Sequence, residues 1–191
     1  DSHGEKILGN HLKISFSEIH EGNKLILSNF HSGNDSIDSY FKGKCEAITD
    51  TSAKSFVVTN DNTQNGMPSV IGVYSLCCSG YVIDSHNYFY IHPAVEIKYF
   101  AINEYYQDIQ YSENAEDGCL SSNILATIIG RIISFTDSHC GANKVILYSV
   151  PEAEIFYQRM GFHLFADYMQ KNNERYLEGC IPMYLDLDTM E

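Results

Sequence analysis

Basic residues are scarce in this sequence, which has 12 Lys and Arg against 25 Asp and Glu and a formal net charge of −13. This balance favours solubility and disfavours non-specific binding to nucleic acids or anionic membranes, because both would need a cationic surface. The nearest approach to a basic patch is Lys42 with Lys44, and two lysines are typical of a solvated face. The charge therefore predicts that neither a nucleic acid nor a membrane is the partner.

Cysteine and metal-binding motifs are also missing. None of the six cysteines forms a C-x-x-C pair, and the histidines and cysteines lack the spacing of zinc ligands, so no metal site is predicted. No apolar run approaches membrane-spanning length. The even number of cysteines permits disulfides, but a chain of this length without a signal-peptide pattern predicts reduced thiols and a cytoplasmic protein.

The sequence does contain enough apolar material for a sizeable core. It has 191 residues, of which 44% are hydrophobic and 13% aromatic. No internal repeat or low-complexity linker divides it, so a single domain over residues 1–191 is predicted. Residues 1–4 carry no weight in this prediction, because they can derive from a cloning linker.

Hydrophobic patterning predicts a mixed α+β order of elements. Residues 23–30 are expected to form a first strand, and Ser and Asp N-caps then precede a short helix that runs to about Ala47. Gly-, Asn- and acid-rich segments separate the later strands. These strands are expected at residues 54–61, 69–83, 94–102, 144–150, 162–169 and 181–187.

Two further helices are expected in the second half of the chain. After an acidic loop at residues 103–120, apolar side chains recur at helical spacing from Ile124 to Phe135. The second helix follows the strand at 144–150, where Pro151 suits the first turn and Gly161 suits the end. The parallel strand pair of a β-α-β unit is expected in this region.

Two segments resemble motifs of the GCN5-related N-acetyltransferases (GNAT). The segment AEIFYQRMGF at Ala153–Phe162 resembles the late motif A-x-x-F-Y-x-x-x-G-F of this family. The segment FHSGNDSIDSYF at Phe30–Phe41 resembles the F-x-(C/S)-G-x-x-x-(L/I)-D-x-(F/Y) opening of the branch that includes toxins acting on charged tRNA. The order of elements agrees from about residue 24 to 187. The resemblance implies a GNAT-like fold, with a central twisted mixed sheet of about six to seven strands flanked by about four helices.

The same resemblance implies an N-acyltransferase that moves an acetyl group from acetyl-CoA to a primary amine in a ternary complex. The acceptor, a small molecule or a protein amine, is not identified by the sequence, and a homodimer stays open. Members of the family splay two parallel strands, here 94–102 and 144–150, and the cofactor enters the gap. The residues thereby implied in cofactor binding are Phe100, Ala101, Ile102, Gly118, Ser121, Ser122, Asn123 and Phe156.

Two residues are implied in catalysis by this resemblance. Tyr157 corresponds to the tyrosine that protonates the departing thiolate, and a phenol is protonated at neutral pH. Glu96, inside the apolar strand AVEIKYF, corresponds to a general base in some members, and burial would raise its pKa toward a useful value. The alternatives are that Tyr157 is an ordinary amphipathic-helix residue, and that Glu96 faces solvent beside a surface cation such as Lys98.

One family motif is absent, and its absence keeps two alternatives open. The pyrophosphate loop (Q/R)-x-x-G-x-(G/A) is replaced by residues 103–123, in which Gln107 or Gln110 could take the first position. Only Gly118 lies near the helix start, and carboxylates beside a pyrophosphate are unfavourable unless they turn outward. The chain could therefore be a GNAT-fold binding or regulatory module. A toxin-like acetyltransferase of aminoacyl-tRNA is the other alternative.

Overall fold

The computed structural model describes residues 7–64, 66–170, 174 and 178–189. The described residues form two compact units. The first unit is drawn from Asp1–Ser75 and Tyr99–Thr127, and the second from Leu76–Lys98 and Ile128–Glu191. Three long elements, β3, β4 and α4, run from one unit into the other. The single domain expected for residues 1–191 stays a prediction.

The described residues contain eight strands in one sheet. Their bounds are β1 Ile14–Glu18, β2 Lys54–Asn60, β3 Val70–Ser85, β4 Tyr88–Ile102, β5 Lys144–Ser149, β6 His163–Leu164, β7 Met169–Gln170 and β8 Ile181–Asp186. They pair in the order β1-β2-β3-β4-β5-β8-β6, and β7 pairs with β3. The β4–β5 pairing is parallel, whereas β1–β2, β3–β7, β5–β8 and β6–β8 are antiparallel. The mixed sheet expected from the sequence is confirmed.

Five α-helices accompany these strands in the described part of the chain. They are α1 Lys24–Leu27, α2 Asp35–Phe41, α3 Glu46–Thr49, α4 Leu120–His139 and α5 Glu154–Arg159. Two more helices are present than the three that the sequence placed, because residues 24–27 form α1 and the chain from residue 35 to 49 breaks into α2 and α3. Cys45, between them, has a left-handed backbone with φ of 52° that a continuous helix does not allow. No described helix is long and apolar enough to cross a membrane.

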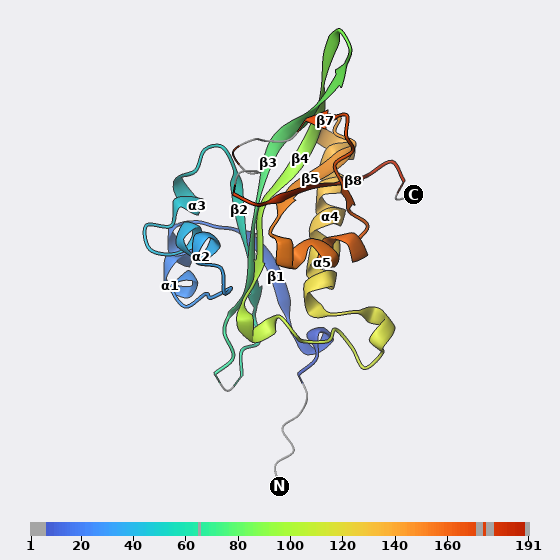
Figure 1. The fold of residues 1–191 in the computed structure, drawn as a ribbon. Coiled ribbons are helices and arrows are strands. Elements are labelled where there is room, and N and C mark those ends of the chain that lie inside the picture. The colour runs from blue at the N-terminus through green and yellow to red at the C-terminus, as the bar shows by residue number, and fades with distance from the viewer. Residues whose placement is uncertain (1–6, 65, 171–173, 175–177, 190–191) are drawn as a thin grey trace. The chain divides into compact units, whose positions relative to one another are not determined.

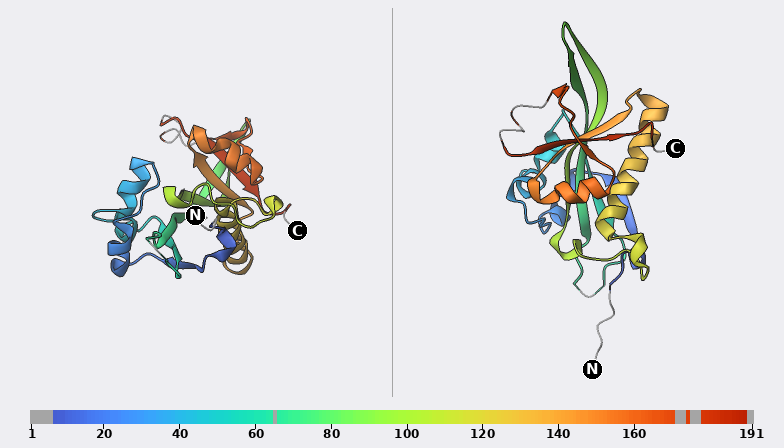
Figure 2. Two further views of the ribbon diagram at one scale, coloured as in Figure 1. Left: turned by 90° about the horizontal axis from the view of Figure 1, so that it is seen from below. Right: turned by 45° about the vertical axis from the view of Figure 1, so that its right-hand side comes forward.

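The core of the first unit lies where α1, α2 and α3 pack beside β2 and the adjoining parts of β3 and β4. Figures 1 and 2 show the three helices gathered together. Asn34 starts α2, since its side chain accepts hydrogen bonds from the amides of Ser36 and Ile37. The rings of Tyr40 and Tyr99 lie 4.5 Å apart, so α2 is held against β4 by aromatic packing.

The strand expected at residues 23–30 is wrong. This segment forms a 3-10 turn at Glu21–Asn23 and then α1, and the first strand is the earlier segment Ile14–Glu18. His20 and Asn23 explain the helical start, because the His20 ring accepts from the Gly22 amide at 3.1 Å and the Asn23 side chain accepts from the His20 amide at 2.9 Å, as in a capping box. The short apolar run has no clear helical or strand periodicity, so the local capping determined that it became a helix.

The second unit contains β5, β8 and α5. Strand β5 pairs with β8 over six residue pairs, from Lys144 opposite Asp186 to Ser149 opposite Ile181. The Lys144 ammonium lies 2.9 Å from the Asp186 carboxylate across this pair. Helix α5 ends as expected, since Gly161 has φ of +92°, a conformation that an L side chain rarely adopts.

Helix α4 has the amphipathic pattern that its sequence predicts. Its buried apolar side chains recur at positions 120, 124, 125, 128, 129 and 132. Phe135 departs from the pattern, because it is exposed and stacks on His139. The helix begins at Leu120, the last residue of the segment expected as the acidic loop.

Candidate functional site

The parallel pair of strands β4 and β5 has an unusually short ladder. Val95 pairs with Val145 and Glu96 pairs with Ile146, and the ladder comprises only these two residue pairs. Both strands continue beyond it, β4 to Ile102 and β5 to Ser149. The two strands therefore pair at these two positions and not beyond Glu96 and Ile146, as expected for strands that separate.

Glu96 lies in this short ladder, on the second unit. Its neighbours Val95 and Ile97 are buried, and Glu96 itself is half-buried on the other face of the strand. Among the described residues no ion pair is present at Glu96, and Lys98 lies two residues further along on the same face of β4, so the alternative of a solvent-facing Glu96 stays open. The catalytic role of Glu96 stays a prediction.

Tyr157 is a nearly buried residue of α5, with 8% of its surface exposed. Its ring packs edge-on against Phe156 and Phe162, at centroid distances of 5.3 and 5.7 Å. Burial raises the pKa of Tyr157 above its ordinary value, so the phenol stays protonated. Its hydroxyl has no hydrogen-bond partner in the described part of the chain, which leaves it able to donate to a ligand.

The start of α4 presents backbone donors. Among the described residues, the amide N–H groups of Ser121 and Ser122 have no hydrogen-bond partner, as the first turn of a helix allows. Together with the helix dipole, two such groups can bind an anion such as a phosphate. This arrangement fits the pyrophosphate role that the resemblance implies for residues 121–122.

The side chains around this turn make hydrogen bonds to the backbone of the preceding loop. The Ser122 hydroxyl binds the backbone of Cys119, and the Asn123 amide donates to the carbonyls of Asp117 and Cys119. Gly118 has φ of +73°, and a Cβ there would lie 2.9 Å from the Ser122 hydroxyl. These side chains hold the loop in shape, so the backbone donors are the groups that remain as anion ligands.

The acidic loop between β4 and α4 is held by backbone hydrogen bonds within it and to the N-terminal segment. Gln110 and Cys119 form an isolated antiparallel bridge, and the amide of Gly9 donates to the Gln110 carbonyl at 2.8 Å. Its carboxylates are all exposed to solvent, at Glu104, Asp108, Glu113, Glu116 and Asp117. Because solvent surrounds these carboxylates, their repulsion of an anion at the start of α4 is weakened by screening.

The end of β4 is joined to the start of α4 by Gln107. Its side-chain amide donates to the Ile102 carbonyl at 2.9 Å, and its backbone carbonyl accepts from the Ser121 hydroxyl at 3.4 Å. Gln107 was one of two candidates for the first position of the missing phosphate motif. Among the residues implied in cofactor binding, those from Phe100 to Asn123 thus belong to one connected part of the first unit. Glu96, Phe156 and Tyr157 belong to the second unit.

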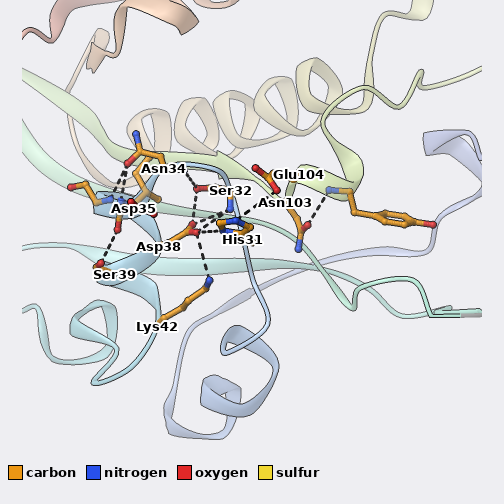
Figure 3. A network of polar contacts seen from close by, with 12 residues as sticks. His31, Ser32, Asn34, Asp35, Asp38, Ser39, Lys42, Asn103 and Glu104 are labelled. Atoms are coloured by element: carbon orange, nitrogen blue, oxygen red, sulfur yellow. Dashed lines mark hydrogen bonds and ion pairs between the residues drawn. The ribbon is translucent and has the colours of Figure 1, made fainter.

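A polar network that the sequence reading missed lies in the first unit (Figure 3). The His31 Nδ1 is 2.6 Å from the Asp38 Oδ2, and its Nε2 is 3.8 Å from the Glu104 Oε2. Asp38 is buried and accepts further hydrogen bonds from Ser32, at 3.0 Å from the amide and 2.6 Å from the hydroxyl. The only signal in the sequence was a histidine inside the FHSGNDSID motif.

Comparison with known proteins supports the fold. No protein-family model and no curated protein matches the sequence. Solved structures do match over nearly the whole chain, and the fold is the GNAT fold expected from the two motifs.

Three of these structures illustrate the likeness. The KacTA–DNA complex aligns with a TM-score of 0.64 and 14% identity, over 93% of this chain and 95% of that one. A tyrosine-to-phenylalanine mutant of the AtaT toxin, bound to the C-terminus of the antitoxin AtaR and acetyl-CoA, aligns with a TM-score of 0.63 and 13% identity, over 92% and 94%. AtaT complexed with acetyl-methionyl-tRNAfMet aligns with a TM-score of 0.64 and 13% identity, over 93% and 96%.

Metal binding finds no support in the described residues. They contain no group of three or more His, Cys, Asp or Glu side chains that could hold a metal ion. The chemistry that the residues of the candidate site offer is hydrogen bonding, proton transfer and anion binding.

Proposed function

We propose that the chain is an acetyl-CoA-dependent N-acetyltransferase that acetylates a primary amine by direct transfer. The observation that carries this proposal is the two-pair ladder between the parallel strands β4 and β5 in a GNAT fold. Strands that part expose backbone to which an extended ligand can add like another strand. The pantetheine arm of acetyl-CoA has the amide groups for such pairing.

Residues of the first unit suit the pantetheine arm and the pyrophosphate of acetyl-CoA. The backbone from Phe100 to Ile102 would pair with the pantetheine arm, and the free amides of Ser121 and Ser122 would bind the pyrophosphate. Gly118 and Asn123 would act indirectly, by keeping the loop in shape before α4. Phe156, half-buried on α5, is assigned to the cofactor site by the resemblance alone.

Tyr157 would protonate the departing thiolate. Its buried phenol stays protonated and its hydroxyl has no protein partner among the described residues, which are the two properties that a waiting acid needs. Glu96 is retained as a candidate base that acts on the acceptor amine through water.

The acceptor is proposed to be a cationic amine, because the chain carries a formal net charge of −13. The charge argues against a nucleic acid as the main partner. The related complexes of KacTA with DNA and of AtaT with acetyl-methionyl-tRNAfMet keep aminoacyl-tRNA as a second acceptor class. The Phe30–Phe41 motif, which forms α2 and its Asp38 network, favours this second candidate.

A thermal-shift measurement with acetyl-CoA tests the proposal. At a cofactor concentration one hundred times its dissociation constant, binding stabilises the folded chain by about 2.7 kcal/mol. For a chain of this size the melting temperature should rise by roughly 5–10 °C. A comparison with longer acyl-CoAs would define the acyl chain. Absence of a shift at millimolar acetyl-CoA would instead favour a binding or regulatory module.

The toxin candidate has a separate test. Induced expression of the chain should arrest growth, and a small antitoxin-like protein encoded beside it should restore growth. Acetylated aminoacyl-tRNA should accumulate in the arrested cells, detected by mass spectrometry of the released amino acids. Normal growth with unmodified aminoacyl-tRNA would exclude this candidate and leave the small-amine candidate in place.

A further inference from the structure

The segment Leu8–Asn10 is hydrogen-bonded to the loop that leads into α4. The amide of Gly9 donates to the Gln110 carbonyl, and the amide of Asn10 donates to the Tyr111 carbonyl, both at 2.8 Å. The short turn at Gly9–His11 therefore lies beside this loop, although the two are far apart in the sequence (Figure 1). Both belong to the first unit.

The loop residues that accept these two bonds also pair with the start of α4. The Tyr111 amide donates to the Gly118 carbonyl at 3.0 Å, and the Leu120 amide donates to the Ile109 carbonyl at 2.8 Å. Leu120 is the first residue of α4. The loop thus connects the segment Leu8–Asn10 to the first turn of this helix by a continuous set of backbone hydrogen bonds.

Close apolar packing accompanies the hydrogen bonds. Leu8, Gly9 and Leu120 are all buried. A Cβ on Gly9 would lie 3.0 Å from the Leu120 Cδ1 and 3.0 Å from the Tyr111 Cδ2. Glycine therefore allows an approach that a larger residue does not. The place of the segment depends directly on the side chain with which α4 begins.

The residues that follow Leu120 carry the donors of the proposed phosphate site. The amides of Ser121 and Ser122 have no hydrogen-bond partner among the described residues. Two amides bind one anion only when both N–H groups point toward it, which depends on the backbone of the first turn. Because Leu120 is bonded to the loop and packs beside Gly9, the segment Leu8–Asn10 helps to set that backbone.

We propose that the segment Leu8–Asn10 is a clamp that positions the first turn of α4 for the pyrophosphate of acetyl-CoA, with Gly9 as the positioning residue. This inference rests on the proposed function, since it concerns the site assigned there to the pyrophosphate. The clamp contacts the loop and α4, so it acts on the affinity for acetyl-CoA and not on proton transfer. Linkage makes the effect reciprocal, and bound acetyl-CoA stabilises the docked clamp.

Hydrogen exchange measured by NMR tests this reciprocity in the wild type. Saturating acetyl-CoA should slow exchange of the Gly9 and Asn10 amides about 5-fold or more relative to the Lys42 amide. The Lys42 amide is the internal control, because it is bonded to the Asp38 carbonyl at 2.9 Å and lies outside the clamp. If all three amides slow by the same factor, acetyl-CoA stabilises the whole unit and the clamp is not coupled to it.

A pair of glycine variants tests the positioning. Gly9→Val should raise the dissociation constant of acetyl-CoA about 10-fold, measured by calorimetric titration below the melting temperature. In any acetylation assay it should raise KM for acetyl-CoA and leave kcat unchanged. Gly141→Val is the matched control, because no atom lies within 4 Å of a Cβ on this exposed glycine, and it should bind like the wild type.

The ligand itself provides a second comparison. Acetylpantetheine has the thioester and the pantetheine arm of acetyl-CoA but no pyrophosphate. Gly9→Val should therefore weaken acetyl-CoA and leave the affinity for acetylpantetheine unchanged, whereas a general loss of structure would weaken both. Gly9→Ala, with a smaller side chain, should fall between Gly9→Val and the wild type, and it replaces Gly9→Val if that variant does not fold.

The outcomes separate this inference from the function beneath it. If the Gly9 variants bind acetyl-CoA as tightly as Gly141→Val, or lose acetyl-CoA and acetylpantetheine equally, the segment Leu8–Asn10 does not position the phosphate site. The proposed function would stand in both cases. If the wild type does not bind acetyl-CoA, the proposed function fails and the clamp fails with it.

Discussion

At the scale of single residues, the clearest prediction concerns the Tyr157 hydroxyl. Tyr157→Phe should lower kcat about 10²-fold, because it removes only the proposed proton donor. It should leave the melting temperature unchanged, since that hydroxyl has no hydrogen-bond partner among the described residues to lose. Steady-state assays of CoA release and differential scanning calorimetry would measure the two effects. Unchanged turnover would remove Tyr157 from the mechanism.

The lowered pKa of Asp38 predicts how the free energy of unfolding depends on pH. Burial acts to raise its pKa, but Ser32, His31 and Lys42 together lower it in the folded chain. The unfolded value is about 3.9. A group with a lower pKa in the folded state stabilises that state above its unfolded pKa, and the contribution is lost as pH falls through the folded pKa. The free energy of unfolding should therefore decrease as pH falls from about 5 toward about 2.

The matched comparison for this prediction is Asp38→Asn against Asp137→Asn. The first removes the ionisation that the network favours, so its unfolding free energy should vary less steeply with pH over the acid range. The second removes the same charge from an exposed position on α4 and should retain the wild-type slope. Urea denaturation at several pH values gives both slopes, and equal slopes would contradict a stabilising role for the Asp38 carboxylate.

At the scale of elements, the close approach of β3 and β4 depends on Gly72. A Cβ at this position would lie 2.8 Å from the Ala101 carbonyl oxygen and 2.8 Å from the Ile102 Cδ1. Gly72→Ala should therefore destabilise the chain by about 1–3 kcal/mol, as overpacking usually does. It should also weaken acetyl-CoA binding, since the displaced backbone is the segment proposed to pair with the pantetheine arm. Denaturation and calorimetric titration measure the two losses.

Gly130 in α4 provides the control for Gly72. No atom lies within 4 Å of a Cβ built there, and alanine is the better helix former by about 1 kcal/mol. Gly130→Ala should thus raise the free energy of unfolding without affecting acetyl-CoA binding. Equal effects of the two substitutions would mean that the contact between β3 and β4 at residue 72 is not tight.

At the scale of the whole molecule, the net charge of −13 predicts a response to salt. Like charges repel in the compact state, and added salt shortens the range of this repulsion from about 30 Å at 0.01 M to about 8 Å at 0.15 M. The melting temperature should therefore rise when NaCl increases from about 10 to about 150 mM, with most of the rise at the lower concentrations. A melting temperature that falls with salt would show that attractive ion pairs outweigh the repulsion.

Much of the fold was predictable from the sequence because its signals are local. The period of apolar residues predicted α4, and Gly161 predicted the end of α5, whereas Pro151 begins a 3-10 turn at Pro151–Ala153 that precedes this helix. Continuous β-type runs in the sequence predicted the strands β2, β3, β5 and β8. The strand expected at residues 23–30 failed, because the capping pair His20 and Asn23 outweighed a short apolar run that fits either structure.

The candidate site likewise has a part that local sequence signals predict and a part that depends on tertiary contacts. The sequence by itself predicts a role for Tyr157 and contains the Phe30–Phe41 motif around Asp38, because a motif is a set of neighbours along the chain. Only the tertiary structure decided that the ladder of β4 and β5 stops after Glu96, that Gln107 joins Ile102 to Ser121, and that His31 lies between Asp38 and Glu104. Glu104 lies 73 residues after His31 along the printed sequence. Hydrogen bonds act over about 3 Å in space and take no account of that separation, so only the folded chain brings these groups together.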